Sequence, residues 1–276
     1  AGHLQQNKLA VTVYNRSYDK AVKWHEEYKG QYAKTAKAAC NEADVVLVCV
    51  GNDNDLQQIC YGEQGVLSGL KKGAILVDHT TTSAEVAIEI ADACEQQGNI
   101  FLDAPVSGGE IGAQNGQLTI MVGGAESAFK QAQTVFKHYA KQSTLLGDVG
   151  SGQTCKMVNQ LCIAGVLQGL SEGLTLAQKA GLDLVQVRDV LKHGAAQSWQ
   201  LEQRTHTIAK DEFDFGFAID LMRKDLNISI QQAEQLGLSL PLANMVDDAY
   251  QQLQQQGHNL NDTSVLIKAT QQQLFT

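Results

Sequence analysis

The first half of the chain alternates short apolar runs with longer stretches in which apolar residues recur every three or four positions. Two of the longer stretches, EVAIEIADACEQQG (85–98) and ESAFKQAQTVFKHYA (126–140), have the spacing of amphipathic helices. The apolar runs predict strands that are buried on both faces: LAVTVYN (9–15), DVVLVCV (44–50), AILVDHT (74–80), IFLDAPV (100–106) and LTIMVGG (118–124). This alternation predicts an α/β fold with a doubly wound parallel sheet.

The pattern changes near residue 150. Residues 154–182 form one long helical pattern that is apolar over most of its circumference, which predicts a helix buried on nearly all sides. Gly165, Gly169 and Gly173 recur every four residues along it, a spacing that lets another backbone approach closely. Helical patterns without strands follow to the end. We therefore predict a dinucleotide-binding domain over residues 1–149 and an all-helical domain over residues 150–276, beginning with a long interdomain helix.

The chain opens on a helical pattern that leads into the apolar run at 9–15. A doubly wound nucleotide-binding domain normally begins with a strand and a glycine-rich turn ahead of that helix. Neither is present after Ala1. We therefore expect a Rossmann-type domain truncated at its N-terminus, lacking about 15–20 residues that include the first strand and the glycine loop.

Composition excludes several classes of protein. The chain has 276 residues, 43% hydrophobic and 18% charged, with a net charge of −9, which is typical of a globular protein and unlike a nucleic-acid-binding one. We expect no membrane partner, because no apolar run is long enough to span a bilayer. We expect a cytoplasmic protein, because the sequence shows no signal peptide and its six cysteines, without a C-x-x-C pair, suit reduced, buried side chains. No metal is expected, because neither H-x-x-x-H nor H-E-x-x-H occurs.

The end of the first predicted strand bears on the cofactor. An acidic residue at this place accepts hydrogen bonds from the ribose of NAD, whereas an arginine nearby suits the 2′-phosphate of NADP. The chain has Asn15, Arg16 and Ser17 here and lacks the acid. These three residues are candidate cofactor contacts, and they favour NADP, with NAD as the alternative.

Two glycine-containing stretches carry candidate chemistry. In the first, Ser107, Gly108 and Gly109 follow a buried strand; glycines in such a turn let backbone N–H groups surround an anion such as a substrate carboxylate. In the second, VGSGQTCKMVNQ (149–160), two glycines precede Lys156 at the start of the long helix. Each stretch alone also suits a purely structural turn or a solvated lysine.

Taken together, these stretches are more specific. Two stretches resemble the β-hydroxyacid dehydrogenase family, which includes 3-hydroxyisobutyrate dehydrogenase and the glyoxylate and succinic semialdehyde reductases. The first is DAPVSGGEIGAQNGQLTIMVGG, from Asp103 to Gly124. The second is the pattern G-x-G-x-x-x-K-x-x-N around Lys156. The resemblance runs over essentially the whole chain. It implies a Rossmann-type domain followed by a helical domain, in agreement with the hydrophobic pattern.

The resemblance also implies roles for individual residues. It implies that Lys156 is the catalytic lysine and that Ser107, Gly108 and Gly109 bind the substrate carboxylate. It implies further cofactor contacts at Val50, Gly51, Asp55, Thr81, Phe217, Lys224 and Asp225.

One position departs from the family. Relatives usually carry Asn four residues after the lysine, often as an Asn-Asn pair, and this chain has Asn159-Gln160. Both are candidate substrate contacts. Gln160 is on the same helix face as Lys156, and its longer side chain alters the reach of the amide.

These features predict an oxidoreductase that transfers a hydride between a nicotinamide cofactor and a small 3-hydroxy acid or semialdehyde, such as 3-hydroxyisobutyrate, glyoxylate or succinic semialdehyde. Lys156 would act as general acid and base. The alternatives are an imine reductase-like relative and a non-catalytic cofactor-binding member, although such relatives generally replace the lysine. The expected partners are a small carboxylated substrate and further copies of the chain, in a homodimer or homotetramer formed through the helical domain.

Overall fold

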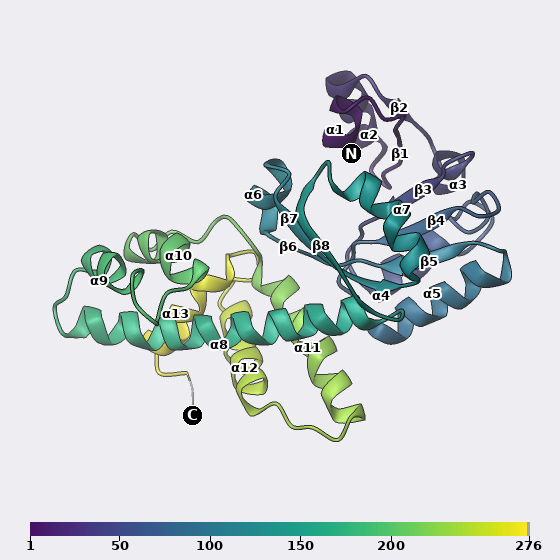
Figure 1. Ribbon diagram of the computed structural model, residues 1–276. Helices are drawn as coiled ribbons and strands as arrows, with labels where there is room; N and C mark the ends of the chain where they lie inside the picture. The colour runs from purple at the N-terminus through teal and green to yellow at the C-terminus, as the bar shows by residue number, and fades with distance from the viewer. Residues whose placement is uncertain (275–276) are drawn as a thin grey trace. The chain divides into compact units, whose positions relative to one another are not determined.

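The computed structural model describes residues 1–274 and divides into two compact units, Ala1–Lys156 and Met157–Thr276. The first unit combines helices and sheets, and the second is helical (Figure 1). The long helix α8 (Ser151–Lys179) is continuous across the boundary, which falls seven residues after the predicted domain boundary.

The first unit is organised around a six-stranded sheet. β3 (Val45–Val48), β4 (Ile75–Asp78) and β5 (Ile100–Asp103) pair in parallel, and β7 (Leu118–Gly124) pairs with β5, β6 (Val106–Ser107) and β8 (Ala140–Gly147). A separate parallel pair joins β1 (Thr12–Val13) to β2 (Gln31–Tyr32). The helices of this unit are α1 (Gly2–Gln6), α2 (Tyr18–Tyr28), α3 (Ala36–Cys40), α4 (Asp53–Cys60), α5 (Ala84–Gln96), α6 (Gly109–Gln114) and α7 (Glu126–Phe136).

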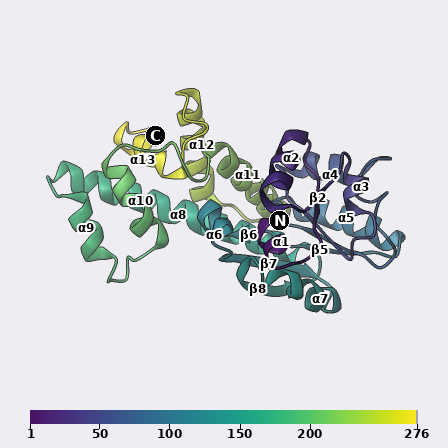
Figure 2. The same ribbon diagram turned by 90° about the horizontal axis from the view of Figure 1, so that it is seen from above.

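Apolar clusters cover both faces of this sheet, as the consecutive apolar positions of the strands require. Leu76 of β4 packs in a cluster with residues of α4 and α5. Its neighbours Ile75 and Val77 point to the other face and pack in a cluster with residues of α7. Figure 2 shows α7 beside β8 and α5 beside β5.

The second unit has one apolar core. Its elements are the greater part of α8, then α9 (Leu184–Leu191), α10 (Trp199–Ala209), α11 (Ile219–Gln235), α12 (Pro241–Gln255), the 3₁₀ helix η1 (Thr263–Val265) and α13 (Leu266–Gln271). The core includes Met222 and Leu226 of α11 and the fully buried Tyr250 of α12. The Tyr250 hydroxyl donates a hydrogen bond to the carbonyl of Thr263 (2.8 Å), so this buried polar group is satisfied.

The α/β class with a helical second part is confirmed, but the sheet is mixed and not wholly parallel. β7 runs antiparallel to β5 and β6. Three strands, β2, β6 and β8, were not predicted as separate strands; the predicted strand over 100–106 is interrupted after Asp103, which separates β6 from β5. β8 mixes half-buried with exposed residues and has four consecutive polar residues, 141–144, so it lacks the continuous apolar run by which the other strands were identified.

The prediction that the long helix is buried on nearly all sides is wrong. Val158, Val166 and Leu176 of α8 are exposed, and a side chain at Gly169 or Gly173 would meet nothing within 4 Å. The buried positions of α8 recur every three or four residues, as in a helix that packs on one face. The prediction of reduced, buried cysteines holds in part: none of the six forms a disulfide, but Cys49 and Cys162 are exposed.

Within residues 1–274, no helix is long and apolar enough to cross a membrane. The same residues contain no group of three or more His, Cys, Asp or Glu side chains that could hold a metal ion.

His79 joins three strands of the first unit. It follows β4, its Nδ1 donates to the carbonyl of Ala104 after β5 (2.6 Å), and its Nε2 accepts from the hydroxyl of Tyr139 ahead of β8 (2.8 Å). The Ala104 carbonyl can only accept, so Nδ1 carries a proton, and in the neutral ring Nε2 is the acceptor. Burial lowers the pKa of His79 from 6.5 to about 4.

We expect His79 to make the protein less stable in mild acid. Between pH 6.5 and pH 4 the unfolded chain binds a proton at His79 and the folded chain does not, so the free energy of unfolding falls as pH falls through this window. A shift of this size corresponds to about 3 kcal/mol. Urea unfolding of wild type and His79→Asn at several pH values checks this. The Asn amide can still donate to Ala104 but does not titrate, so the two curves should converge toward pH 4, and parallel curves would contradict the assignment.

Candidate active site

The loops that follow the parallel strands lie at one edge of the sheet. The strand register places Val48, Asp78 and Asp103 side by side at the carboxyl ends of β3, β4 and β5. In open α/β sheets, ligands bind outside this edge. The predicted contacts Val50, Gly51 and Thr81 lie on the loops that begin here, and Ser107–Gly109 follow β5 at the junction of β6 and α6.

The loops after β3 and β4 are tied together. The backbone N–H of Val50 donates to the Thr80 hydroxyl (3.0 Å), which links the two loops next to Gly51 and Thr81. The Asp53 carboxylate accepts from both the backbone and the hydroxyl of Ser83 (3.1 and 2.6 Å). The starts of α4 and α5 are therefore held against each other.

The Ser107–Gly109 turn is open to solvent and depends on glycine. Ser107 pairs with Thr119 of β7, which holds the start of the turn on the sheet. Gly108 has φ of 129°, a conformation that side-chain-bearing residues rarely adopt, and a Cβ there would come within 3.3 Å of Leu118. Both glycines are exposed, so their backbone N–H groups can approach an anion.

A buried carboxylate holds the start of α8. Asp103, the first residue of the predicted substrate motif, is fully buried and accepts from the N–H groups of Gly150 and Gln153 (both 2.8 Å). Burial raises the pKa of Asp103, and the backbone hydrogen bonds oppose that rise. Gly152 allows the close approach, since a Cβ there would lie 2.5 Å from the carbonyl oxygen of Met121.

Gln153 holds the same helix from a second side. Its side-chain amide donates to the carbonyl of Thr80 (2.8 Å) and accepts from the N–H of Thr82 (3.1 Å). The first turn of α8 is therefore bonded both to the end of β5 and to the loop that carries Thr81. Lys156 follows Gln153 by one turn and is 8% exposed. Its backbone position is set by buried hydrogen bonds on two sides.

In the second unit, four predicted residues form one connected group. The Gln160 amide donates to Asp225 Oδ2 (2.8 Å) and accepts from Asn159 (2.7 Å). Lys224 forms an ion pair with Asp225 Oδ1 (3.0 Å). The residue that departs from the family therefore bonds to the predicted Lys-Asp pair.

Phe217 lies on a loop fixed by Asp262. Its backbone N–H donates to Asp262 Oδ2 (3.0 Å), and the half-buried ring packs against the apolar core of the second unit. Asp262 is fully buried and pairs with Arg204 (3.0 Å), whose guanidinium lies over the rings of Trp199 and Phe215.

Asn15, Arg16 and Ser17 follow β1. The Asn15 side chain accepts from the N–H of Ser17 (2.9 Å), so its acceptor serves the turn that begins α2. The Arg16 side chain is 81% exposed and lies 3.2 Å from Asp55 of α4. Two predicted cofactor contacts that are 39 residues apart thus meet.

Sequence reasoning missed Asp103 and Gln153 as residues that position the site. The signal for Asp103 was present, because an acid ends a buried strand immediately ahead of Ala-Pro. The sequence contains no such signal for Gln153, because its partners Thr80 and Thr82 are more than 70 residues away.

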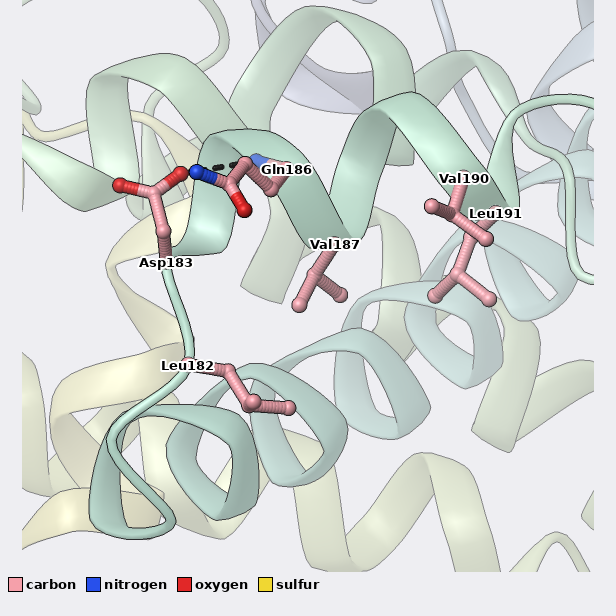
Figure 3. Close-up of a pocket in the computed structure, with 6 residues that line it drawn as sticks. All are labelled: Leu182, Asp183, Gln186, Val187, Val190 and Leu191. Atoms are coloured by element: carbon pink, nitrogen blue, oxygen red, sulfur yellow. Dashed lines mark hydrogen bonds between the residues drawn. The ribbon is translucent and has the colours of Figure 1, made fainter.

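One apolar depression lies on α9, away from these loops in the sequence (Figure 3). Its carboxylate, Asp183, accepts from the N–H of Gln186 and caps the helix (2.8 Å). The remaining lining is almost entirely apolar and offers no cation for a carboxylated substrate: Leu182, Val187, Val190 and Leu191.

Comparison with known proteins identifies the family. Residues 1–147 match the NAD binding domain of 6-phosphogluconate dehydrogenase, and residues 150–270 match the NAD-binding domain family of NADP-dependent 3-hydroxyisobutyrate dehydrogenase. An uncharacterized oxidoreductase of Shewanella frigidimarina is 52% identical over 97% of this chain and 92% of its own length. The 2-hydroxy-3-oxopropionate reductase of Escherichia coli is 37% identical over 86% of this chain and 81% of its own length.

A solved structure agrees with these relatives. The 3-hydroxyisobutyrate dehydrogenase of Mycobacterium tuberculosis, in a structure with L-serine, superposes with a TM-score of 0.87 at 27% identity and covers 98% of this chain and 93% of its own. The chain belongs to the β-hydroxyacid dehydrogenase family. It is an NAD(P)-dependent oxidoreductase that acts on the CH–OH group of hydroxyacids.

The residues present suit a nicotinamide dinucleotide. The loops after β3 and β4 lie at the carboxyl edge of the sheet, where ligands bind in open α/β folds. Arg16 offers an exposed guanidinium. The hydroxyl of Thr82, next to Thr81, is buried without a hydrogen-bond partner within residues 1–274, which leaves a polar group for a ligand at this loop.

We expect Asp103→Asn to weaken both the fold and the reaction. The Asn side chain has one acceptor in place of two, and its NH₂ faces a backbone N–H, so the start of α8 loses a hydrogen bond at a buried site. The cost should be about 1–3 kcal/mol in the free energy of unfolding. Denaturant unfolding measures this, and steady-state kinetics should show a lower kcat because Lys156 is displaced. The exposed Asp92→Asn serves as the control, and equal stability of the two variants would contradict the role of Asp103.

Proposed function

We propose that the protein is an NADP-preferring reductase of small carboxylated aldehydes, with Lys156 as general acid and base. Its substrates would be semialdehydes or keto acids related to 3-hydroxyisobutyrate, glyoxylate or succinic semialdehyde. One observation carries the proposal: a lysine that is 8% exposed lies one turn after a helix start held by buried hydrogen bonds of Asp103 and Gln153.

A nicotinamide cofactor held at this site would supply or accept the hydride. In the direction of reduction, the Lys156 ammonium donates a proton to the oxygen that becomes the alcohol. In the direction of oxidation, the neutral amine accepts that proton. A proton donor held at the point where charge develops contributes about 10²–10⁴-fold in rate, and the positive charge of the lysine also stabilises the developing alkoxide.

The Ser107–Gly109 turn would bind the substrate carboxylate. The Ser107 hydroxyl and the exposed backbone N–H groups of the two glycines are suited to an anion. Asn159 and Gln160 would also contact the substrate. The Gln160 amide already bonds to Asn159 and Asp225, so a substrate would exchange for one of these partners.

Arg16 supports the preference for NADP. Its exposed guanidinium follows β1, where NADP-binding sites carry a cation for the 2′-phosphate. The family model matched by the second half of the chain is that of an NADP-dependent dehydrogenase, which agrees with this choice. Val50, Gly51, Asp55, Thr81, Phe217, Lys224 and Asp225 remain proposed cofactor contacts.

A substrate panel with both cofactors tests the proposal. The full-length protein is assayed with NADPH and NADH against glyoxylate, succinic semialdehyde, methylmalonate semialdehyde and tartronate semialdehyde. We expect at least one of these aldehydes to be reduced, with a higher kcat/KM for NADPH. Lys156→Ala should lower kcat by about 10²–10⁴-fold while NADPH still binds, as measured by its fluorescence.

Lys156→Arg is the matched control, because Arg keeps the positive charge but releases its proton far less readily. Compared with Lys156→Ala, the Arg variant should restore binding of the aldehyde more than it restores kcat. Undiminished turnover in Lys156→Ala would refute the role of the lysine, and a tenfold preference for NADH would refute the cofactor assignment.

We also propose that the protein forms a homodimer or homotetramer through its helical unit. The supporting observation is a set of exposed apolar side chains on α8 and α9, where Leu176 and Val190 are 71% and 72% exposed. Exposed apolar surface of this kind is typical of contacts between subunits.

Sedimentation velocity checks the assembly. We expect a species larger than the monomer, which Leu176→Glu combined with Val190→Glu shifts toward the monomer because charges would be buried at the contact. Leu260→Glu changes an equally exposed residue (76%) outside α8 and α9 and should leave the assembly intact. A monomeric wild type would refute the proposal.

A further inference from the structure

Arg16 and Asp55 form an ion pair between two neighbouring elements of the first unit. Arg16 follows β1, and Asp55 lies in the first turn of α4, which follows β3. The Arg16 guanidinium is 3.2 Å from Asp55 Oδ1. The cation that favours NADP is therefore paired with a carboxylate of the same chain.

The carboxylate is the better-held partner. The N–H of Asp55 donates to the Asn52 side chain (2.9 Å), which caps α4. Its Oδ2 lies 2.6 Å from the point where a side chain on Gly51 would begin, so the carboxylate rests against the loop after β3. The side chain of Asp55 is 26% exposed and that of Arg16 is 81% exposed. Arg16 can therefore move more easily than Asp55.

The two groups favour different cofactors. A carboxylate accepts a hydrogen bond from the ribose 2′-hydroxyl of NAD, and an arginine binds the 2′-phosphate of NADP. The position after β1 where an acid would stand is Asn15, and its acceptor already bonds to Ser17. Asp55 is the acid that the structure brings to Arg16.

We propose that Asp55 sets the cofactor specificity of the enzyme by competing with the 2′-phosphate of NADP for Arg16. This proposal rests on the proposed function, in which Arg16 binds that phosphate. Without the phosphate, Asp55 holds Arg16 and offers its carboxylate to a ribose hydroxyl. With the phosphate, Arg16 turns to the ligand and leaves Asp55 beside an anion. Asp55 thus moderates the preference for NADP.

The size of the effect follows from the exposure of the pair. An ion pair with one partner this exposed contributes little to folding stability, so Arg16 is readily released. The 2′-phosphate, however, is dianionic near neutral pH and meets a carboxylate that is held in place. Each charge–charge interaction near an exposed surface corresponds to about a three- to tenfold change in affinity, and salt screens it.

Ligand binding to Asp55→Asn tests the proposal without depending on catalysis. Calorimetric titration of the full-length protein with 2′,5′-ADP and with 5′-AMP compares adenosine ligands with and without the 2′-phosphate. We expect Asp55→Asn to bind 2′,5′-ADP about three- to tenfold more tightly and 5′-AMP no more tightly. The gain should shrink in 0.5 M NaCl. The kcat/KM ratio of NADPH to NADH should rise by a similar factor.

Two further variants give the experiment its controls. Asp92→Asn removes an exposed carboxylate of α5 and should change neither affinity. Arg16→Ala should weaken 2′,5′-ADP binding and abolish the effect of Asp55→Asn in the double variant, because the competition acts through Arg16.

The outcomes separate this proposal from the proposed function. If Arg16→Ala weakens 2′,5′-ADP binding but Asp55→Asn leaves the ratio of the two affinities unchanged, the specificity role of Asp55 is wrong and the NADP preference stands. If Arg16→Ala leaves 2′,5′-ADP binding unchanged, the role of Arg16 in NADP binding fails, and the competition fails with it. Tighter binding of both ligands to Asp55→Asn would also overturn the proposal, because the effect would not depend on the phosphate.

Discussion

The site depends above all on one buried carboxylate. Asp103 ends β5 and accepts hydrogen bonds from the first turn of α8, so the central sheet and the helix that carries Lys156 are joined without an intervening flexible segment. Four residues after Asp103, Ser107 begins the turn suited to an anion. One short segment of chain therefore supports both the Ser107–Gly109 turn and the lysine, and Gln153 fixes the same helix to the loop with Thr81.

The strands and helices with strong hydrophobic patterns could be predicted because burial on both faces of a sheet leaves a continuous apolar run. β8 could not, since it has exposed, polar positions and is held mainly by its pairing with β7. The antiparallel direction of β7 could not be predicted either, because it depends on pairing across the sheet and no local sequence pattern encodes it. The apolar surface of α8 predicted burial, but the helix packs on one face only and leaves Val158 and Leu176 exposed.

In the site, too, local motifs could be predicted and long-range contacts could not. Lys156 and Ser107–Gly109 stand in compact motifs, so residue types and spacing were enough to propose them as site residues. The bonds that position the helix with Lys156 join residues 47 to 73 positions apart, and the Arg16–Asp55 pair spans 39. Such contacts depend on how the sheet brings its loops together. The sequence showed that an acid was absent at Asn15, and only the fold showed that Asp55 approaches the neighbouring arginine.

The attachment of α8 also bears on how such an enzyme could evolve. The hydrogen bonds that anchor the helix use the carboxylate of Asp103 and the amide of Gln153, and neither involves the exposed Ser107–Gly109 turn. Mutations in the exposed turn, or at position 160 further along the helix, could therefore accumulate while the lysine keeps its place. Changes in substrate preference would then be separable from the chemistry, which allows one scaffold to diversify among related acids through small, independent steps.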